Sequence, residues 1–148
     1  MSPSPDASMK NLYRELDLKN ILLVGDDPWT RETLSFFFQI QGCRLESAAG
    51  AREGNAALSN DRFDMVLCEY SLPDGDGLSF LKSSGNIEPG ALKFLIAVSP
   101  IRQVSEEAAM AGIHDVIFKP FIIEALEESL ERYFLRTRGR GREEVTVE

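Results

Sequence analysis

Short apolar runs alternate along the chain with longer segments in which apolar residues recur every three or four positions. The runs are rich in strand-forming residues and have the length of strands buried in a sheet. The longer segments have the spacing of helices with one apolar face. The predicted strands are 21–24, 44–48, 64–69, 92–99 and 115–119, and the predicted helices are 28–41, 51–59, 77–86, 102–111 and a last helix that ends near 136.

Strand and helix therefore alternate five times with short connections between them. Such alternation predicts a parallel sheet with helices on both faces, because each return to a parallel strand needs a crossover. We expect a flavodoxin-like (βα)5 fold, which is a doubly wound α/β sandwich whose five strands have the order 2-1-3-4-5. Asp27 and Pro28 suit the start of the first helix, and Gly42 suits its end.

The ends of the chain differ in composition from the central part. The first ten residues are rich in Ser and Pro, and residues 11–19 predict at most a short helical turn. Residues 1–19 are therefore interpreted as a flexible arm and residues 20–136 as the domain. Arginines alternate with Gly and Thr from 136 onward, so residues 137–148 are interpreted as a flexible tail or linker.

The charge and cysteine content narrow the choice of function. A net charge of −8 argues against nucleic acid or an anionic membrane as the ligand of this domain. No apolar run approaches the length of about 20 residues that spans a bilayer. Cys43 and Cys68 have no metal-ligand spacing and are expected to be reduced thiols in the core. These features predict a cytoplasmic protein.

Polar residues stand where the predicted strands end. Asp26 and Asp27 follow the first strand, Glu69 ends the third, Ser99 ends the fourth and Lys119 ends the fifth. The carboxyl ends of parallel strands lie at one edge of the sheet, so these groups should converge. Carboxylate and carbonyl oxygens suit Mg²⁺, and a lysine and a hydroxyl suit the oxygens of a phosphoryl group. A salt-bridge cluster without a signalling role is the alternative interpretation.

Over residues 20–136 the chain resembles the response-regulator receiver domains of two-component signalling systems. The order and separation of several segments fit that family, and Lys-Pro-Phe after a buried strand is especially specific. The matching segments are 21–28 with Arg31 and Leu34, then 64–77, Ser99, Ala111-Gly112 and Lys119-Pro120-Phe121.

The resemblance implies roles for individual residues. Asp26 and the backbone carbonyl of Ser71 correspond to metal ligands, and Asp27 is a further candidate ligand. Ser99 corresponds to the hydroxyl that follows the phosphoryl group, and Lys119 to the lysine that pairs with the acceptor carboxylate. A cis peptide bond is expected before Pro120.

Three residues depart from the pattern of the family. Glu69 stands where the family has the phosphate-accepting aspartate, Gly25 replaces the first acid of the metal site, and Val116 replaces an aromatic switch residue. A glutamate carries its carboxylate about 1.5 Å further, and a misplacement of about 1 Å can cost roughly a hundredfold in rate. We therefore expect weak Mg²⁺ binding, through Asp26, Glu69 and Ser71, and a domain held near one conformation.

The first predicted helix also has an apolar stripe away from the core. Leu34, Phe37 and Phe38 face the core, whereas helical phase places Trp29, Phe36 and Ile40 on a different face. This stripe is predicted to be an interaction patch, unless the N-terminal arm or a loop covers it. Asp74 and Asp76 are expected to be solvated turn residues.

The leading hypothesis is an atypical receiver that acts as a protein-interaction module and is not an enzyme. Its expected partner is a histidine kinase, an output domain or a second copy of the chain. A working phosphate-accepting receiver is one alternative, and an Mg²⁺-dependent phosphohydrolase on a similar fold is another. The phosphohydrolase is disfavoured because the central strand carries no aspartate nucleophile.

Overall fold

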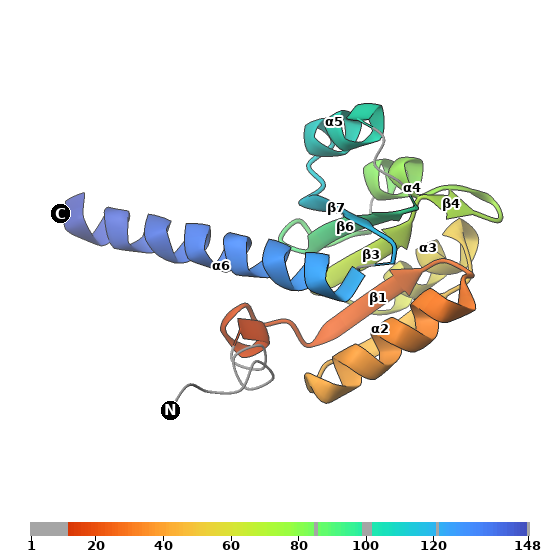
Figure 1. Cartoon of the computed structure of the whole chain (residues 1–148), viewed down its shortest axis with the longest axis horizontal. Coiled ribbons are helices and arrows are strands. Elements are labelled where there is room, and N and C mark those ends of the chain that lie inside the picture. The colour runs from red at the N-terminus through yellow and green to blue at the C-terminus, as the bar shows by residue number, and fades with distance from the viewer. Residues whose placement is uncertain (1–11, 85, 99–101, 121, 148) are drawn as a thin grey trace.

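The structure is a computed structural model that describes residues 12–84, 86–98, 102–120 and 122–147. A parallel sheet of five strands forms its centre, in the order β2-β1-β3-β6-β7 (Figure 1). In chain order this is the predicted order 2-1-3-4-5, so the prediction of a flavodoxin-like fold is confirmed. The strands are β1 Asn20–Val24, β2 Arg44–Ala48, β3 Met65–Glu69, β6 Leu92–Ala97 and β7 Asp115–Phe118.

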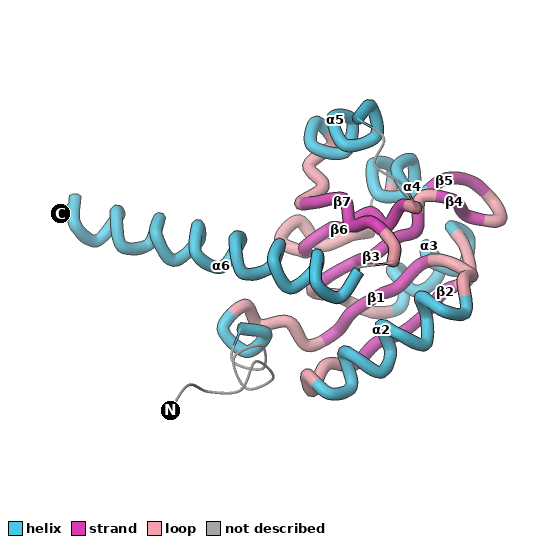
Figure 2. Tube along the Cα trace, viewed as in Figure 1, coloured by secondary structure: helices cyan, strands magenta, loops and turns pink. Residues whose placement is uncertain are grey.

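Helices cover both faces of the sheet, as Figure 2 shows. Leucines and aromatic residues of the helices Pro28–Ile40 and Ile122–Val147 pack on one face of the sheet. Apolar residues of the three helices between them in the chain pack on the opposite face. This two-sided burial is why β3 is apolar as far as Cys68 and why most positions of β1 and β6 are apolar. The helices are α2 Pro28–Ile40, α3 Ala51–Asn60, α4 Gly77–Ser83, α5 Arg102–Met110 and α6 Ile122–Val147.

The strand register brings the ends of β1, β3 and β7 to one edge of the sheet. Val24 of β1 pairs with Cys68 of β3, and Ala97 of β6 pairs with Phe118 of β7. The residues that follow these strands therefore start from neighbouring positions. This register is what allows side chains separated by up to 92 residues to meet.

The described part of the N-terminal arm packs against the core of the domain, where the sequence predicted a flexible arm with at most a short helical turn. Residues 12–15 form a helical turn, and Leu12, Tyr13 and Leu18 are buried in the same core cluster as α2 and α6. The ring of Tyr13 makes edge contacts with Phe37 and Phe38 of α2. These apolar side chains gain more from burial than the chain loses in freedom. Residues 1–11 lie outside the described residues.

The end of the chain also differs from the prediction. Helix α6 does not stop near 136 but continues to Val147, and Figure 1 shows it projecting beyond the sheet. The segment after 136 contains no proline, and Arg and Glu are good helix formers, which offset the cost of the two glycines. Among the described residues, no helix has the length and apolar character needed to cross a membrane.

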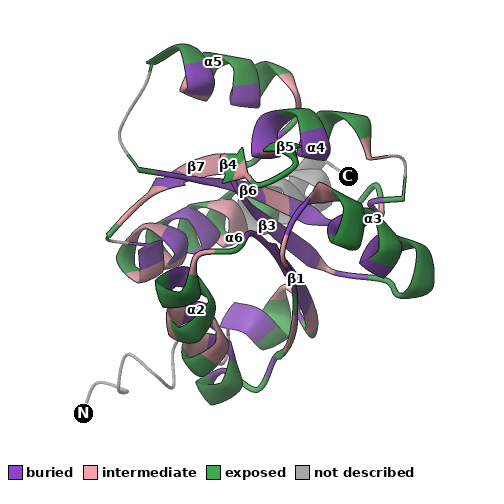
Figure 3. Ribbon diagram, turned by 90° about the vertical axis from the view of Figure 1, so that its right-hand side faces the viewer, coloured by how far each residue is buried: buried purple, intermediate pink, exposed green. Residues whose placement is uncertain are grey.

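Figure 3 shows the buried residues lining the inner faces of the helices and the sheet, with exposed residues on the outer faces. On α2, Leu34 and Phe38 are fully buried, whereas Trp29, Phe36 and Ile40 are 45%, 67% and 41% exposed. The helical phase predicted for this helix is therefore confirmed. The described part of the arm leaves these three side chains open to solvent.

Candidate functional site

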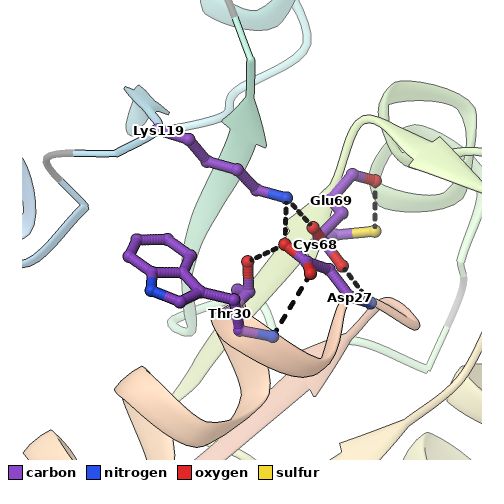
Figure 4. A network of polar contacts seen from close by, with 6 residues as sticks. Asp27, Thr30, Cys68, Glu69 and Lys119 are labelled. Carbon is purple, nitrogen blue, oxygen red and sulfur yellow. Dashed lines mark hydrogen bonds and ion pairs between the residues drawn. The ribbon is translucent and has the colours of Figure 1, made fainter.

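Three charged side chains meet where β1, β3 and β7 end (Figure 4). The ammonium nitrogen of Lys119 lies 2.5 Å from Oε1 of Glu69 and 2.7 Å from Oδ2 of Asp27. The side chain of Glu69 is only 6% exposed and that of Lys119 is 19% exposed. The three residues come from different loops and strands, and the parallel sheet brings them together.

Asp27 has a second role in the local structure. It caps the N-terminus of α2, where Oδ1 accepts a hydrogen bond from the backbone N–H of Trp29 at 3.2 Å. Its other oxygen accepts a hydrogen bond from the hydroxyl of the buried Thr30 at 2.8 Å. Pro28 suits the first helical position because its missing N–H would have no partner there. The cap therefore fixes the carboxylate in the orientation in which it meets Lys119.

The ion pairs shift the pKa values of two of the groups. The hydrogen bond from Lys119, followed by that from Thr30, lowers the pKa of the Asp27 carboxyl below its usual 3.8. Partial burial by itself would lower the pKa of the Lys119 ammonium. Its hydrogen bonds to Asp27 and Glu69 outweigh that effect and raise the pKa above 10.5. Both shifts favour the charged forms.

The carboxylate of Glu69 is also held from the side of β1. Its Oε2 accepts a hydrogen bond from the backbone N–H of Asp27 at 3.2 Å. It lies over Gly25, where a Cβ would be 2.6 Å from Cγ of Glu69 and even closer to Oε2. The Glu69 side chain thus fills the space that a side chain at position 25 would occupy.

The other predicted site residues have different surroundings. Asp26 and Ser71 are exposed and line the same cavity of about 290 Å³ as Asp27, Glu69 and Lys119. The peptide bond between Lys119 and Pro120 is cis, as expected. Val116 is half-buried in β7 and packs against the core. Ser99 lies outside the described residues, so its predicted role stays a prediction.

The described side chains do not fit the magnesium site that the resemblance implies. Both Asp27 and Glu69 are paired with Lys119, and position 25 offers no carboxylate. Within the described ranges, no group of three or more His, Cys, Asp or Glu side chains is arranged to hold a metal ion. The expected weak binding of Mg²⁺ remains a prediction for measurement.

Asp74 is the exposed turn residue that the sequence predicted, whereas Asp76 is half-buried in a short strand; both also accept hydrogen bonds at the start of a helix. The two oxygens of Asp74 accept hydrogen bonds from the backbone N–H groups of Ala51 and Arg52, at 2.8 and 3.0 Å, at the start of α3. Asp76 caps α4 through the N–H of Ser79 at 2.8 Å. The bonds from Arg52 and Ala51 lower the pKa of the Asp74 carboxyl.

The hydrogen bonds of Asp74 and Asp76 hold the loop that follows Glu69 against α3 and the start of α4. The loop contains a small hairpin of β4 Ser71–Leu72 and β5 Gly75–Asp76. Asp74 ties the hairpin to α3, more than twenty residues earlier in the chain. A turn-rich sequence predicts such acids in the loop, but it carries no signal for the pairing of Asp74 with α3.

Taken together, the fold and this site define a doubly wound α/β domain with an acid–lysine cluster at the carboxyl edge of its parallel sheet. Residues 21–131 match the family model of the response regulator receiver domain. The chain therefore belongs to the response regulator receiver domain family, as its sequence resemblance implied.

Curated relatives support this assignment. Transcriptional regulatory protein ZraR of Salmonella typhimurium is 27% identical over 124 residues, which cover 84% of this chain and 28% of ZraR. Transcriptional activator protein PfeR of Pseudomonas aeruginosa is 30% identical over 118 residues, which cover 80% of this chain and 38% of PfeR. The chain thus spans well under two thirds of the length of these relatives.

Solved structures agree with the fold. A CheY-like response regulator receiver domain protein from Methanospirillum hungatei has a TM-score of 0.68 and 29% identity, and the match covers 78% of this chain and 95% of that one. The chemotaxis response regulator CheY4 of Vibrio cholerae has a TM-score of 0.68 and 24% identity, and the match covers 78% and 98% of the two chains.

Proposed function

We propose that this domain is an atypical receiver, which acts in two-component signal transduction as a regulatory interaction module and is not phosphorylated in the usual way. One observation carries the proposal. Glu69, at the position of the acceptor aspartate in the family, has one oxygen bonded to Lys119 and the other to the backbone N–H of Asp27.

This engagement opposes phosphoryl transfer in two ways. A carboxylate that attacks a phosphodonor needs an oxygen aligned with the phosphorus atom. The two bonds hold the Glu69 carboxylate over position 25, and a displacement of about 1 Å can cost roughly a hundredfold in rate. Lys119 corresponds to the lysine that pairs with the acceptor carboxylate in the family, but here it is also paired with Asp27, so two carboxylates share the charge that would meet a phosphoryl group. The site therefore favours one resting arrangement of charges.

The exposed stripe of Trp29, Phe36 and Ile40 on α2 supports an interaction role. It begins beside the site, because the backbone N–H of Trp29 is bonded to Asp27. A large apolar stripe that stays solvent-exposed is a common feature of protein interfaces. We infer that a histidine kinase, an output domain or a second copy of the chain is the class of partner.

The fluorescence of Trp29, the single tryptophan of the chain, tests this proposal directly. Mg²⁺ is titrated first, and beryllofluoride, which imitates a bound phosphoryl group, is added next. We expect weak Mg²⁺ binding and no saturable response to beryllofluoride. Tight Mg²⁺ binding followed by a saturable second change would instead favour a working phosphate acceptor. Steady release of phosphate from acetyl phosphate would favour a phosphohydrolase.

A further inference from the structure

Gly25 stands where the receiver family has the first acid of its metal site, and it lies next to the side chain of Glu69. Gly25 directly follows β1 and has a φ of +155°, a conformation that side chains rarely adopt. The three atoms nearest to a Cβ at this position all belong to the end of the Glu69 side chain, namely Oε2, Cγ and Cδ. No backbone atom is among these three, so the closest contacts of a side chain here would be with the Glu69 side chain, in addition to the strain of the positive φ.

We propose that Gly25 is a positioning residue for Glu69, and that the two residues form one compensating pair. The missing side chain at 25 creates the space in which the longer side chain of Glu69 lies. From there Glu69 reaches both Lys119 and the backbone N–H of Asp27. The inference rests on the proposed function, because it explains how the site is kept from taking up metal and phosphoryl groups.

The number of carboxylates at positions 25 and 69 decides whether these two positions can bind a cation. An acid at 25 and an aspartate at 69 would supply two separate carboxylates to a cation. Gly25 and Glu69 supply one, which lies over position 25 and is bonded to Lys119. The pair therefore exchanges a cation site for an internal ion pair. A single change produces neither the cation site nor the ion pair. An acid at 25 alone would crowd the space that Glu69 fills, and a shorter side chain at 69 alone would leave part of that space empty.

The structure offers a matched control for the collision. Gly75 has a φ of +154°, almost the same as Gly25, but nothing lies within 4 Å of a Cβ built on it. Gly75→Ala therefore measures the backbone strain alone, whereas Gly25→Ala adds the collision with Glu69. Glu69→Ala removes all three of the atoms that a Cβ at 25 would meet, so Gly25→Ala/Glu69→Ala completes the comparison.

The first experiment measures urea unfolding of these variants and the ¹⁵N–¹H resonance of Asp27, whose amide donates to Glu69. We expect Gly25→Ala to lower the folding equilibrium constant at least fivefold more than Gly75→Ala, and to shift the Asp27 amide. Introducing Glu69→Ala should remove that excess, because none of the three clashing atoms is then present. Equal costs at 25 and 75, an unmoved Asp27 amide, or strictly additive effects in the double variant would overturn the proposal.

The second experiment measures Mg²⁺ affinity by Trp29 fluorescence in the wild type, Gly25→Asp, Glu69→Asp and the double variant. We expect the double variant to bind Mg²⁺ at least tenfold more tightly than either single variant. Equal affinity in Gly25→Asp and the double variant would overturn the pairing. If Gly25→Asp does not fold, the Ala series above still decides the question.

The two experiments also separate this inference from the proposed function. A wild-type domain that responds to beryllofluoride would refute the function, and the unfolding cycle would still report whether Gly25 and Glu69 are coupled. Conversely, additive unfolding effects in an unresponsive wild-type domain would refute the pair and leave the interaction module standing.

Discussion

The ammonium group of Lys119 lies 2.7 Å from the carboxylate of Asp27, a residue 92 positions earlier that also caps helix α2. The bond joins the loop after β7 to the start of α2 across the candidate site. With the second bond to Glu69, it makes Lys119 the cation that connects both acids of the cluster. The stability of the site should therefore depend on this one residue.

Lys119→Met should lower the free energy of unfolding at pH 7 by about 2 kcal/mol, because it leaves two partly buried carboxylates without their charged donor. Denaturant unfolding measures this, with Lys19→Met as the control. Lys19 forms an exposed pair with Asp17, and exposed pairs are worth about 0–1 kcal/mol. Equal losses in the two variants would show that the cluster adds no special stability.

The contribution of Lys119 should also depend on pH. The pKa of Asp27 is lowered in the folded protein, so its contribution is complete above 3.8 and is lost as the pH falls through the folded value. The pKa of Lys119 is raised, so its contribution is complete below 10.5 and is lost as the pH rises through the folded value. The difference between wild type and Lys119→Met should therefore be constant from about pH 5 to pH 10 and shrink outside that window. A difference that changes between pH 6 and pH 8 would contradict this.

Tyr13→Phe should stabilise the protein. The hydroxyl of Tyr13 is buried and has no hydrogen-bond partner within the described part of the chain, and burial raises its pKa. Removing it should add about 1 kcal/mol to the free energy of unfolding. Tyr13→Ala, which also removes the ring between the arm and α2, should cost about 3–5 kcal/mol. Urea unfolding distinguishes the two, and a destabilising Tyr13→Phe would indicate a buried water on the hydroxyl.

Phe36 and Phe38 lie two residues apart on α2 and should respond in opposite ways to truncation. Phe36 is 67% exposed, so Phe36→Ala should change the free energy of unfolding by less than about 0.5 kcal/mol. Phe38 is fully buried, and Phe38→Ala should cost about 3–5 kcal/mol. Chemical denaturation of both variants checks this. A large loss from Phe36→Ala would mean that the stripe packs within the chain and is not free for a partner.

Asp74→Ala should release the hairpin from α3 and uncap that helix. Hydrogen exchange of the Ala51 and Arg52 amides should accelerate at least tenfold, because their acceptor is removed. Asp61→Ala is the control, since in the described part of the chain the Asp61 side chain makes only a 4.0 Å contact with the exposed Arg44. Unchanged exchange at both amides would show that water replaces the carboxylate without loss.

The fold could be predicted because its signals are local. The apolar runs of β1, β3 and β6 and the helical periodicity of α2 identify the elements, and the rules for parallel crossovers then restrict how they are ordered. The convergence of Asp27, Glu69 and Lys119 follows from the same topology. The helical phase of α2 likewise separated buried Phe38 from exposed Phe36.

Only the tertiary structure decided which of these side chains pair and which spaces they fill. The fit of Glu69 over Gly25, the capping of α3 by Asp74 and the packing of Tyr13 against α2 each join segments at least twenty residues apart. Such contacts depend on side-chain length and on space that the backbone creates after folding, and composition, charge and periodicity do not encode either. The sequence by itself therefore determined the family and the location of the site, and the folded structure decided its arrangement.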